Sequence, residues 1–115
     1  WDVLEANEEN WESVLASKPL VFVGFFAPWC GHCKKLKPHW AELAAHFAAQ
    51  GDELAEETSG LEPLAVASVD VVANPELYWR YDIKSYPTLR LFRRGVQLVD
   101  CDEVVVETKL LLGGF

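Results

Sequence analysis

The chain has 115 residues, half of them hydrophobic, and a formal net charge of −8. This length is enough for one core but not for two, so we expect residues 1–115 to form a single domain. The acidic balance argues against nucleic-acid binding through a basic patch, and no apolar run approaches the roughly 18 residues of a membrane-spanning helix. The sequence has no methionine and opens on no signal-peptide pattern, so we expect a domain cut from a longer protein.

The first third of the chain predicts a strand, a helix and a second strand. Residues 1–6 contain a short apolar pair that suits an edge strand. Asn7 suits the N-cap of a short helix, whose apolar stripe continues through Trp11, Val14 and Leu15. β-branched and aromatic residues over 20–26 then predict a buried strand.

The stretch Trp29-Cys30-Gly31-His32-Cys33-Lys34 follows that strand and opens a helix predicted over residues 31–50. Two thiols at Cys-x-x-Cys spacing are typical of a dithiol/disulfide active site. Unpaired backbone N–H groups and the helix dipole favour a thiolate at Cys30, and a protonated His32 would add positive charge beside it. We therefore predict that Cys30 is the nucleophile. Cys33 lies one turn further on the same face and is the predicted resolving thiol, which displaces what Cys30 captures.

Two other interpretations of the cysteines and histidines are weaker. Tetrahedral zinc needs four ligands, and the only other cysteine is Cys101. A structural disulfide between Cys30 and Cys33 would close almost no loop. The seven-residue spacing of His32, His39 and His46 is about 10 Å along a helix, too long for shared ligation. We expect neither a metal nor a cofactor.

The second half of the chain continues the alternation of helices and strands. The polar stretch over 51–63 is predicted to be an exposed loop or an extension of the preceding helix. A strand over 64–69 closes at Asp70, and Asn74-Pro75 begins a short helix. A strand over 89–92 and a turn at Arg94-Gly95 lead to an antiparallel partner over 96–100, and a last helix is predicted over 103–112. The order predicts an α/β fold, a mixed sheet flanked by helices on both faces.

Two stretches carry a resemblance to a known family. Residues 26–34, Phe-Ala-Pro-Trp-Cys-Gly-His-Cys-Lys, resemble the active site of the protein disulfide isomerases within the thioredoxin superfamily. Tyr86-Pro87-Thr88 resembles the cis-proline element of that family. The resemblance implies the thioredoxin fold, a cis Pro87 beside the cysteines, and a rim formed by Trp29 and Tyr86 that binds unfolded chains.

The resemblance also implies a function. It is that of an enzyme, a thiol-disulfide oxidoreductase or protein disulfide isomerase acting on cysteines of folding secretory proteins in the lumen of the endoplasmic reticulum. Gly31 and His32, between the cysteines, help decide the direction of the redox reaction. The implied partners are unfolded or misfolded proteins with thiols or disulfides, and glutathione or an oxidase. A cytosolic thioredoxin-type reductase is disfavoured, because His32 replaces a proline.

The chain departs from its relatives at two positions that change together. Relatives carry a buried carboxylate and a facing lysine where this sequence has Gly24 and Ser68, and the carboxylate is thought to take the proton of the resolving cysteine. We expect Cys33 to lack a side-chain base, with water in the space left by Gly24 serving instead. Resolution would then be slow, which favours a second interpretation as a redox-tethered chaperone that binds its clients with weak turnover.

Cys101 has no obvious partner in the sequence. It is predicted to be either a buried inert thiol or a thiol that pairs outside this segment, and the sequence leaves both open.

Overall fold

The computed structural model describes residues 2–59 and 63–100, with the side chains of residues 2–49 and 63–98. The helix predicted over 103–112 and Cys101 lie outside the described residues. The described strands form one sheet in the order β1-β3-β2-β4-β5. β1 and β2 pair with β3 in parallel, whereas β4 is antiparallel to β2 and to β5. This mixed sheet is the one that the sequence predicts. The strands are β1 (Leu4–Ala6), β2 (Leu20–Phe26), β3 (Leu64–Asp70), β4 (Thr88–Arg93) and β5 (Val96–Asp100).

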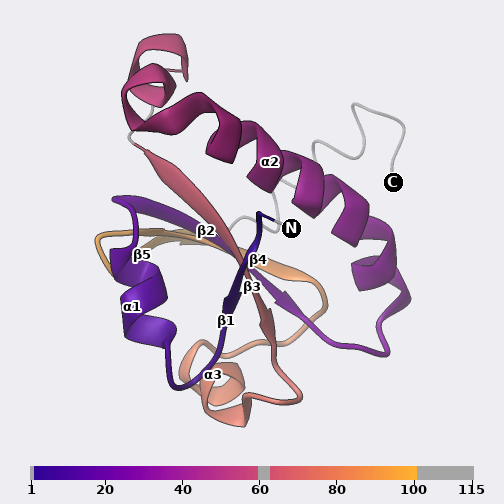
Figure 1. Cartoon of the computed structure of the whole chain (residues 1–115). Coiled ribbons are helices and arrows are strands. Elements are labelled where there is room, and N and C mark those ends of the chain that lie inside the picture. Colours follow the sequence, from indigo (N-terminus) through magenta and orange to yellow (C-terminus); the bar gives the residue numbers. More distant parts are fainter. Residues whose placement is uncertain (1, 60–62, 101–115) are drawn as a thin grey trace.

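Three described helices cover the sheet. They are α1 (Trp11–Ala16), α2 (Gly31–Ser59) and α3 (Pro75–Arg80). Figure 1 shows α2 along one face, while α1 and α3 lie on the other. The prediction that a helix ends near Gln50 is wrong, because α2 continues through Gly51, as the alternative of a helical extension allowed. None of the described helices is long and apolar enough to cross a membrane.

The start of α1 also differs from the prediction, because α1 begins at Trp11 and not just after Asn7. The side chains of Asn7 and Asn10 accept hydrogen bonds from each other's backbone N–H groups, at 2.9 and 2.7 Å. The backbone N–H of Glu8 donates to Asn74 Oδ1 at 3.0 Å. These contacts hold residues 7–10 as a turn against the start of α3, so the helix begins only after the turn.

The sheet separates two hydrophobic cores. β2 lies at the centre and is buried on both faces, which explains its nearly continuous run of apolar residues. Val21, Val23 and Phe25 face the core that α1 and α3 cover. Phe26 belongs to the other core, under α2, together with Cys30, Cys33, Leu36, Trp40 and Leu89. The two cysteines are therefore part of the packing on the α2 side.

Candidate active site

Cys30 lies between the end of β2 and the first residue of α2, where the sequence places it. Its backbone N–H donates to the Ala27 carbonyl at 3.1 Å, and its own carbonyl accepts from Lys34 N–H at 3.2 Å. Its Sγ accepts a hydrogen bond from the backbone N–H of Cys33 at 3.3 Å. The sulfur thus takes the place of an N-cap side chain, where the helix N-terminus favours negative charge.

Cys33 lies deeper than Cys30, and both are free thiols. Cys30 is 7% exposed and Cys33 is 1% exposed. Burial first, and then the side-chain hydrogen bond with Cys30, raise the pKa of the Cys33 thiol to about 11, against opposing backbone hydrogen bonds. In the described part of the chain, no ionisable side chain other than Cys30 shifts the pKa of Cys33. The Cys33 thiol is therefore protonated at neutral pH.

The predicted rim residues lie beside the cysteines. The Tyr86–Pro87 peptide bond is cis, as expected. The Trp29 side chain is 67% exposed, and its ring meets that of Tyr86 edge to face, with centroids 5.2 Å apart. Burial raises the pKa of the Tyr86 hydroxyl, with smaller contributions from Tyr78 and from the two cysteines. Trp29, Tyr86 and the dithiol therefore form one site.

Gly31 and His32 are exposed on the first turn of α2. Their backbone lies beside the sulfur of Cys30 because α2 starts there. No described contact ties the His32 ring to another group, so its predicted effect on the thiolate stays a prediction.

The prediction of a water-filled space at Gly24 is wrong, although Gly24 does face Ser68 in the sheet register. A Cβ on Gly24 would lie 2.5 Å from Cε2 and Cζ of the Phe26 ring and 3.2 Å from Cζ2 of Trp40. Two aromatic rings fill the space instead. Ser68 lines a hollow of about 410 Å³ together with residues that include Phe26, Ala27 and Lys37.

Sequence reasoning missed Tyr78 as a neighbour of the site. It lies on α3, is partly exposed and is close enough to Tyr86 to influence its hydroxyl. Its spacing predicts only that it continues the helix from Pro75. The two tyrosines come from different parts of the fold, and no local pattern indicates that one influences the other.

Comparison with known proteins identifies the family. Residues 2–111 match the thioredoxin family model. Human protein disulfide-isomerase A6 is 39% identical over 102 residues, which cover 88% of this chain and 21% of that protein. Drosophila melanogaster protein disulfide-isomerase is 41% identical over 93 residues, which cover 81% of this chain and 17% of that protein. The first thioredoxin domain of mouse protein disulfide-isomerase A4 superposes with a TM-score of 0.68 at 26% identity, over 96% of this chain and 75% of that one.

The chain thus spans about a fifth of the length of its curated relatives. The matched region includes β2, the Cys30–Cys33 motif, the cis Pro87 and all described strands of the sheet. The chain belongs to the thioredoxin family, as a domain homologous to those of protein disulfide-isomerases, and the site supports the thiol-disulfide oxidoreductase chemistry of that family.

Proposed function

We propose that this domain catalyses thiol-disulfide exchange in folding secretory proteins, with Cys30 as the nucleophile and Cys33 as the resolving thiol. The observation that carries the proposal is the place of the Cys30 sulfur at the N-terminus of α2, where it accepts the Cys33 N–H. A sulfur in this position is favoured as a thiolate, the form that attacks disulfides.

The reaction has two balanced steps. The Cys30 thiolate attacks one sulfur of a substrate disulfide, a bond forms between the two sulfurs, and the other substrate sulfur leaves as a thiolate. The Cys33 thiol then loses its proton to solvent, and its thiolate attacks Cys30 Sγ, which releases the substrate thiolate and leaves a Cys30–Cys33 disulfide. If a different substrate thiolate attacks the substrate sulfur of the mixed disulfide first, a new substrate disulfide forms, the Cys30 thiolate leaves, and the substrate is isomerised without net oxidation or reduction.

Trp29, Tyr86 and Pro87 are the proposed substrate-binding residues. The backbone before Pro87 would pair with an extended substrate segment, while the Trp29 and Tyr86 rings contact its apolar side chains. We place the reaction in the lumen of the endoplasmic reticulum. Isomerases have potentials near −180 mV, close to the lumenal poise of about −180 to −210 mV. A dithiol of similar potential can oxidise, reduce or reshuffle substrates there, with glutathione or an oxidase restoring it.

Recovery of activity by a ribonuclease with scrambled disulfides tests this proposal. We expect Cys30→Ser to abolish activity, and Cys33→Ser to accumulate a covalent complex with the substrate that reductant dissolves. A Ser13→Ala variant, far from the dithiol on α1, is the control and should retain activity. Full activity of Cys30→Ser would contradict the assignment.

A second function, retention of clients as mixed disulfides, is favoured by the surroundings of Cys33. Burial remains the main cause of its raised pKa after Cys30 has captured a substrate, because that burial comes from the core under α2. Aromatic rings fill the space at Gly24, so there is no room at that position for a base that could take the proton of Cys33. A client captured by Cys30 would then stay bound for long.

The pH dependence of client release tests retention. Cys33 attacks as a thiolate, so a pKa raised to about 11 makes release slow at neutral pH. The rate should rise about tenfold for each pH unit towards pH 10, as the thiolate fraction grows. Release from a preformed Cys30 mixed disulfide can be followed by quenched-flow mass spectrometry, with Cys33→Ser as the variant that does not release. Fast release at pH 7 with a flat profile above it would contradict retention.

A further inference from the structure

The surface beside the dithiol has a charge opposite to that of the chain. Residues 28–41 contain three of the ten basic residues and none of the eighteen acidic ones. The rest of the chain carries seven basic and eighteen acidic residues. The segment that contains Cys30 is therefore basic within an otherwise acidic chain.

The three lysines of this segment, Lys34, Lys35 and Lys37, all lie exposed on the first two turns of α2. Their positions are four to seven residues from Cys30, about 6–11 Å along the helix axis. Within the described part of the chain none of them forms an ion pair. Glu5 and Asp70 border the same hollow as Lys37 and offset part of its charge, so Lys34 and Lys35 contribute most.

Four of the acidic residues gather on the opposite side of the sheet, whereas Glu5 borders the hollow of Lys37 and Asp2 a hollow beside α2. Four glutamates line a hollow of about 230 Å³ between α1 and α3: Glu8, Glu9, Glu12 and Glu76. At physiological ionic strength the Debye length is about 8 Å, so a segment docked at Cys30 experiences the nearby lysines more than charges across the sheet. Among the described side chains, the lysines near Cys30 therefore act on such a segment more strongly than the glutamates across the sheet.

We infer that Lys34, Lys35 and Lys37 select clients whose reactive cysteine is flanked by acidic residues. The inference rests on the proposed reaction of Cys30 with client disulfides. Complementary charge brings such a segment to the dithiol and speeds its capture, whereas a segment flanked by lysines is repelled. The aromatic rim of Trp29 and Tyr86 carries no formal charge and is indifferent to the sign of the flanking residues.

Capture rates of two matched peptides test the inference. Each peptide carries one cysteine as a mixed disulfide with a coloured aromatic thiol, flanked by glutamates in one and by lysines in the other. In the Cys33→Ser background, attack of the Cys30 thiolate forms the Cys30–peptide bond and releases the aromatic thiolate. At 0.05 M salt we expect the acidic peptide to be captured at least about threefold faster, and the ratio to approach one at 1 M salt.

Substitution of the lysines should remove the preference. The ratio of the two rates should fall to one in the triple variant Lys34→Gln, Lys35→Gln and Lys37→Gln. A change in the ionisation of Cys30 would alter both rates equally, so it would not alter their ratio. The matched control changes Lys18, Arg80 and Arg94 to Gln. These three residues line a hollow of about 580 Å³. Residues that precede β2 also line it, so the hollow lies at the end of β2 that is opposite to Cys30.

The outcomes separate this inference from the proposed function. Equal rates in the parent protein, faster capture of the basic peptide, or an equal loss of preference in the control would overturn the inference while leaving Cys30 as the nucleophile. Failure of Cys30 to capture either peptide would instead contradict the proposed function. A preference that survives the lysine substitutions would also overturn the inference.

Discussion

Gly24 occupies a position in β2 that leaves no room for a side chain. Its place in β2 faces the core under α2, and the Phe26 and Trp40 rings occupy the volume that a side chain would need. The two rings meet edge to face with centroids 6.0 Å apart, which limits how far Phe26 can move. The glycine and the aromatic pair therefore depend on each other.

This dependence predicts the cost of a single methyl group. Gly24→Ala should lower the free energy of unfolding by about 1–3 kcal/mol, because overpacking forces Phe26 from its position. The cost should shrink by at least about 1 kcal/mol in a Phe26→Leu background, where the ring is gone. Urea unfolding of the four proteins in this cycle measures both values.

Gly31 provides the matched control for that cycle. No atom lies within 4 Å of a Cβ built there, so Gly31→Ala should leave stability within about 0.5 kcal/mol or raise it slightly. Equal costs at the two glycines would show that the Phe26 contact does not determine the effect.

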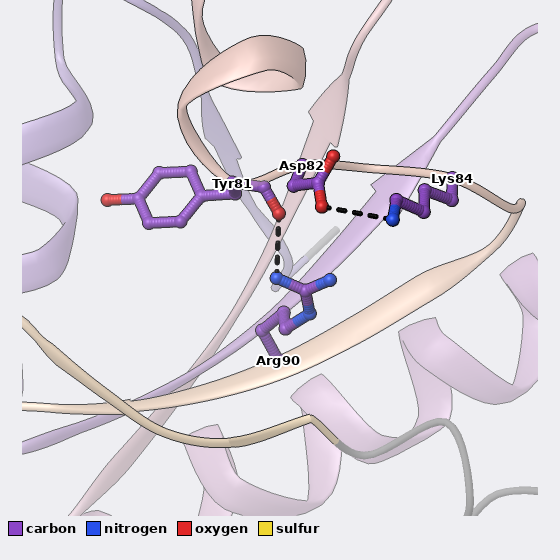
Figure 2. Close-up of polar contacts among 4 residues, drawn as sticks. All are labelled: Tyr81, Asp82, Lys84 and Arg90. Atoms are coloured by element: carbon purple, nitrogen blue, oxygen red, sulfur yellow. Dashed lines mark hydrogen bonds and ion pairs between the residues drawn. The ribbon is translucent and has the colours of Figure 1, made fainter.

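At the scale of the elements, α3 is tied to β4 through Arg90. This buried arginine donates from Nη1 to the Tyr81 carbonyl at 2.9 Å and to Gln97 Oε1 at 3.3 Å. Figure 2 shows the first of these bonds next to an ion pair of 3.3 Å between Asp82 and Lys84. The two contacts lie close together but differ in burial, since both side chains of the ion pair are 79% exposed.

That difference predicts unequal effects of two substitutions. Arg90→Leu should lower the free energy of unfolding by about 1–3 kcal/mol, because it leaves the Tyr81 carbonyl without this donor. Lys84→Ala should change it by less than about 0.5 kcal/mol, because water screens the exposed pair. Denaturant unfolding at constant pH measures both, and a larger effect at Lys84 would contradict the argument.

The sequence predicts the elements that depend on local patterns and misses those fixed by distant contacts. All described strands, the start of α3 and the β4–β5 turn follow from such patterns. At that turn Arg94 and Gly95 have φ of 50° and 85°, as a tight hairpin requires. The start of α1 depends in part on the bond from Glu8 N–H to Asn74 Oδ1, 66 residues further along the chain, so the local pattern alone could not predict it. Gly51 does not end α2, because one glycine costs only about 1 kcal/mol in a helix of good formers.

The candidate site shows the same division. The cysteines, the helix N-terminus and the cis proline are predicted by two short motifs, and the structure packs Tyr86, which precedes the cis bond, against the core that holds the cysteines. What fills the Gly24 space could not be predicted, because Phe26 and Trp40 come from different elements and their ring orientations depend on packing. The prediction of water assumed that the absence of a side chain at Gly24 leaves an empty volume.

At the scale of the whole molecule, the sheet divides the interior into two cores, and only the core under α2 contains the dithiol. The central strand β2 contributes alternate residues to both cores. A perturbation on one side can therefore lower global stability without changing the surroundings of Cys33. The division makes chemistry at the dithiol separable from the stability of the fold.

Two leucines that are almost equally buried, Leu15 at 6% and Leu36 at 7%, test this separation from opposite faces. Each change to alanine should lower the free energy of unfolding by about 2–5 kcal/mol. Only Leu36→Ala opens space in the core that holds Cys33. Easier hydration of Cys33 then lowers the pKa that burial has raised, so only this variant should speed the alkylation of Cys33. Mass spectrometry in a Cys30→Ser background, under conditions where both variants stay folded, measures that rate. Equal acceleration in Leu15→Ala would show that Cys33 reacts through global opening, and that the sheet does not insulate the dithiol from the opposite core.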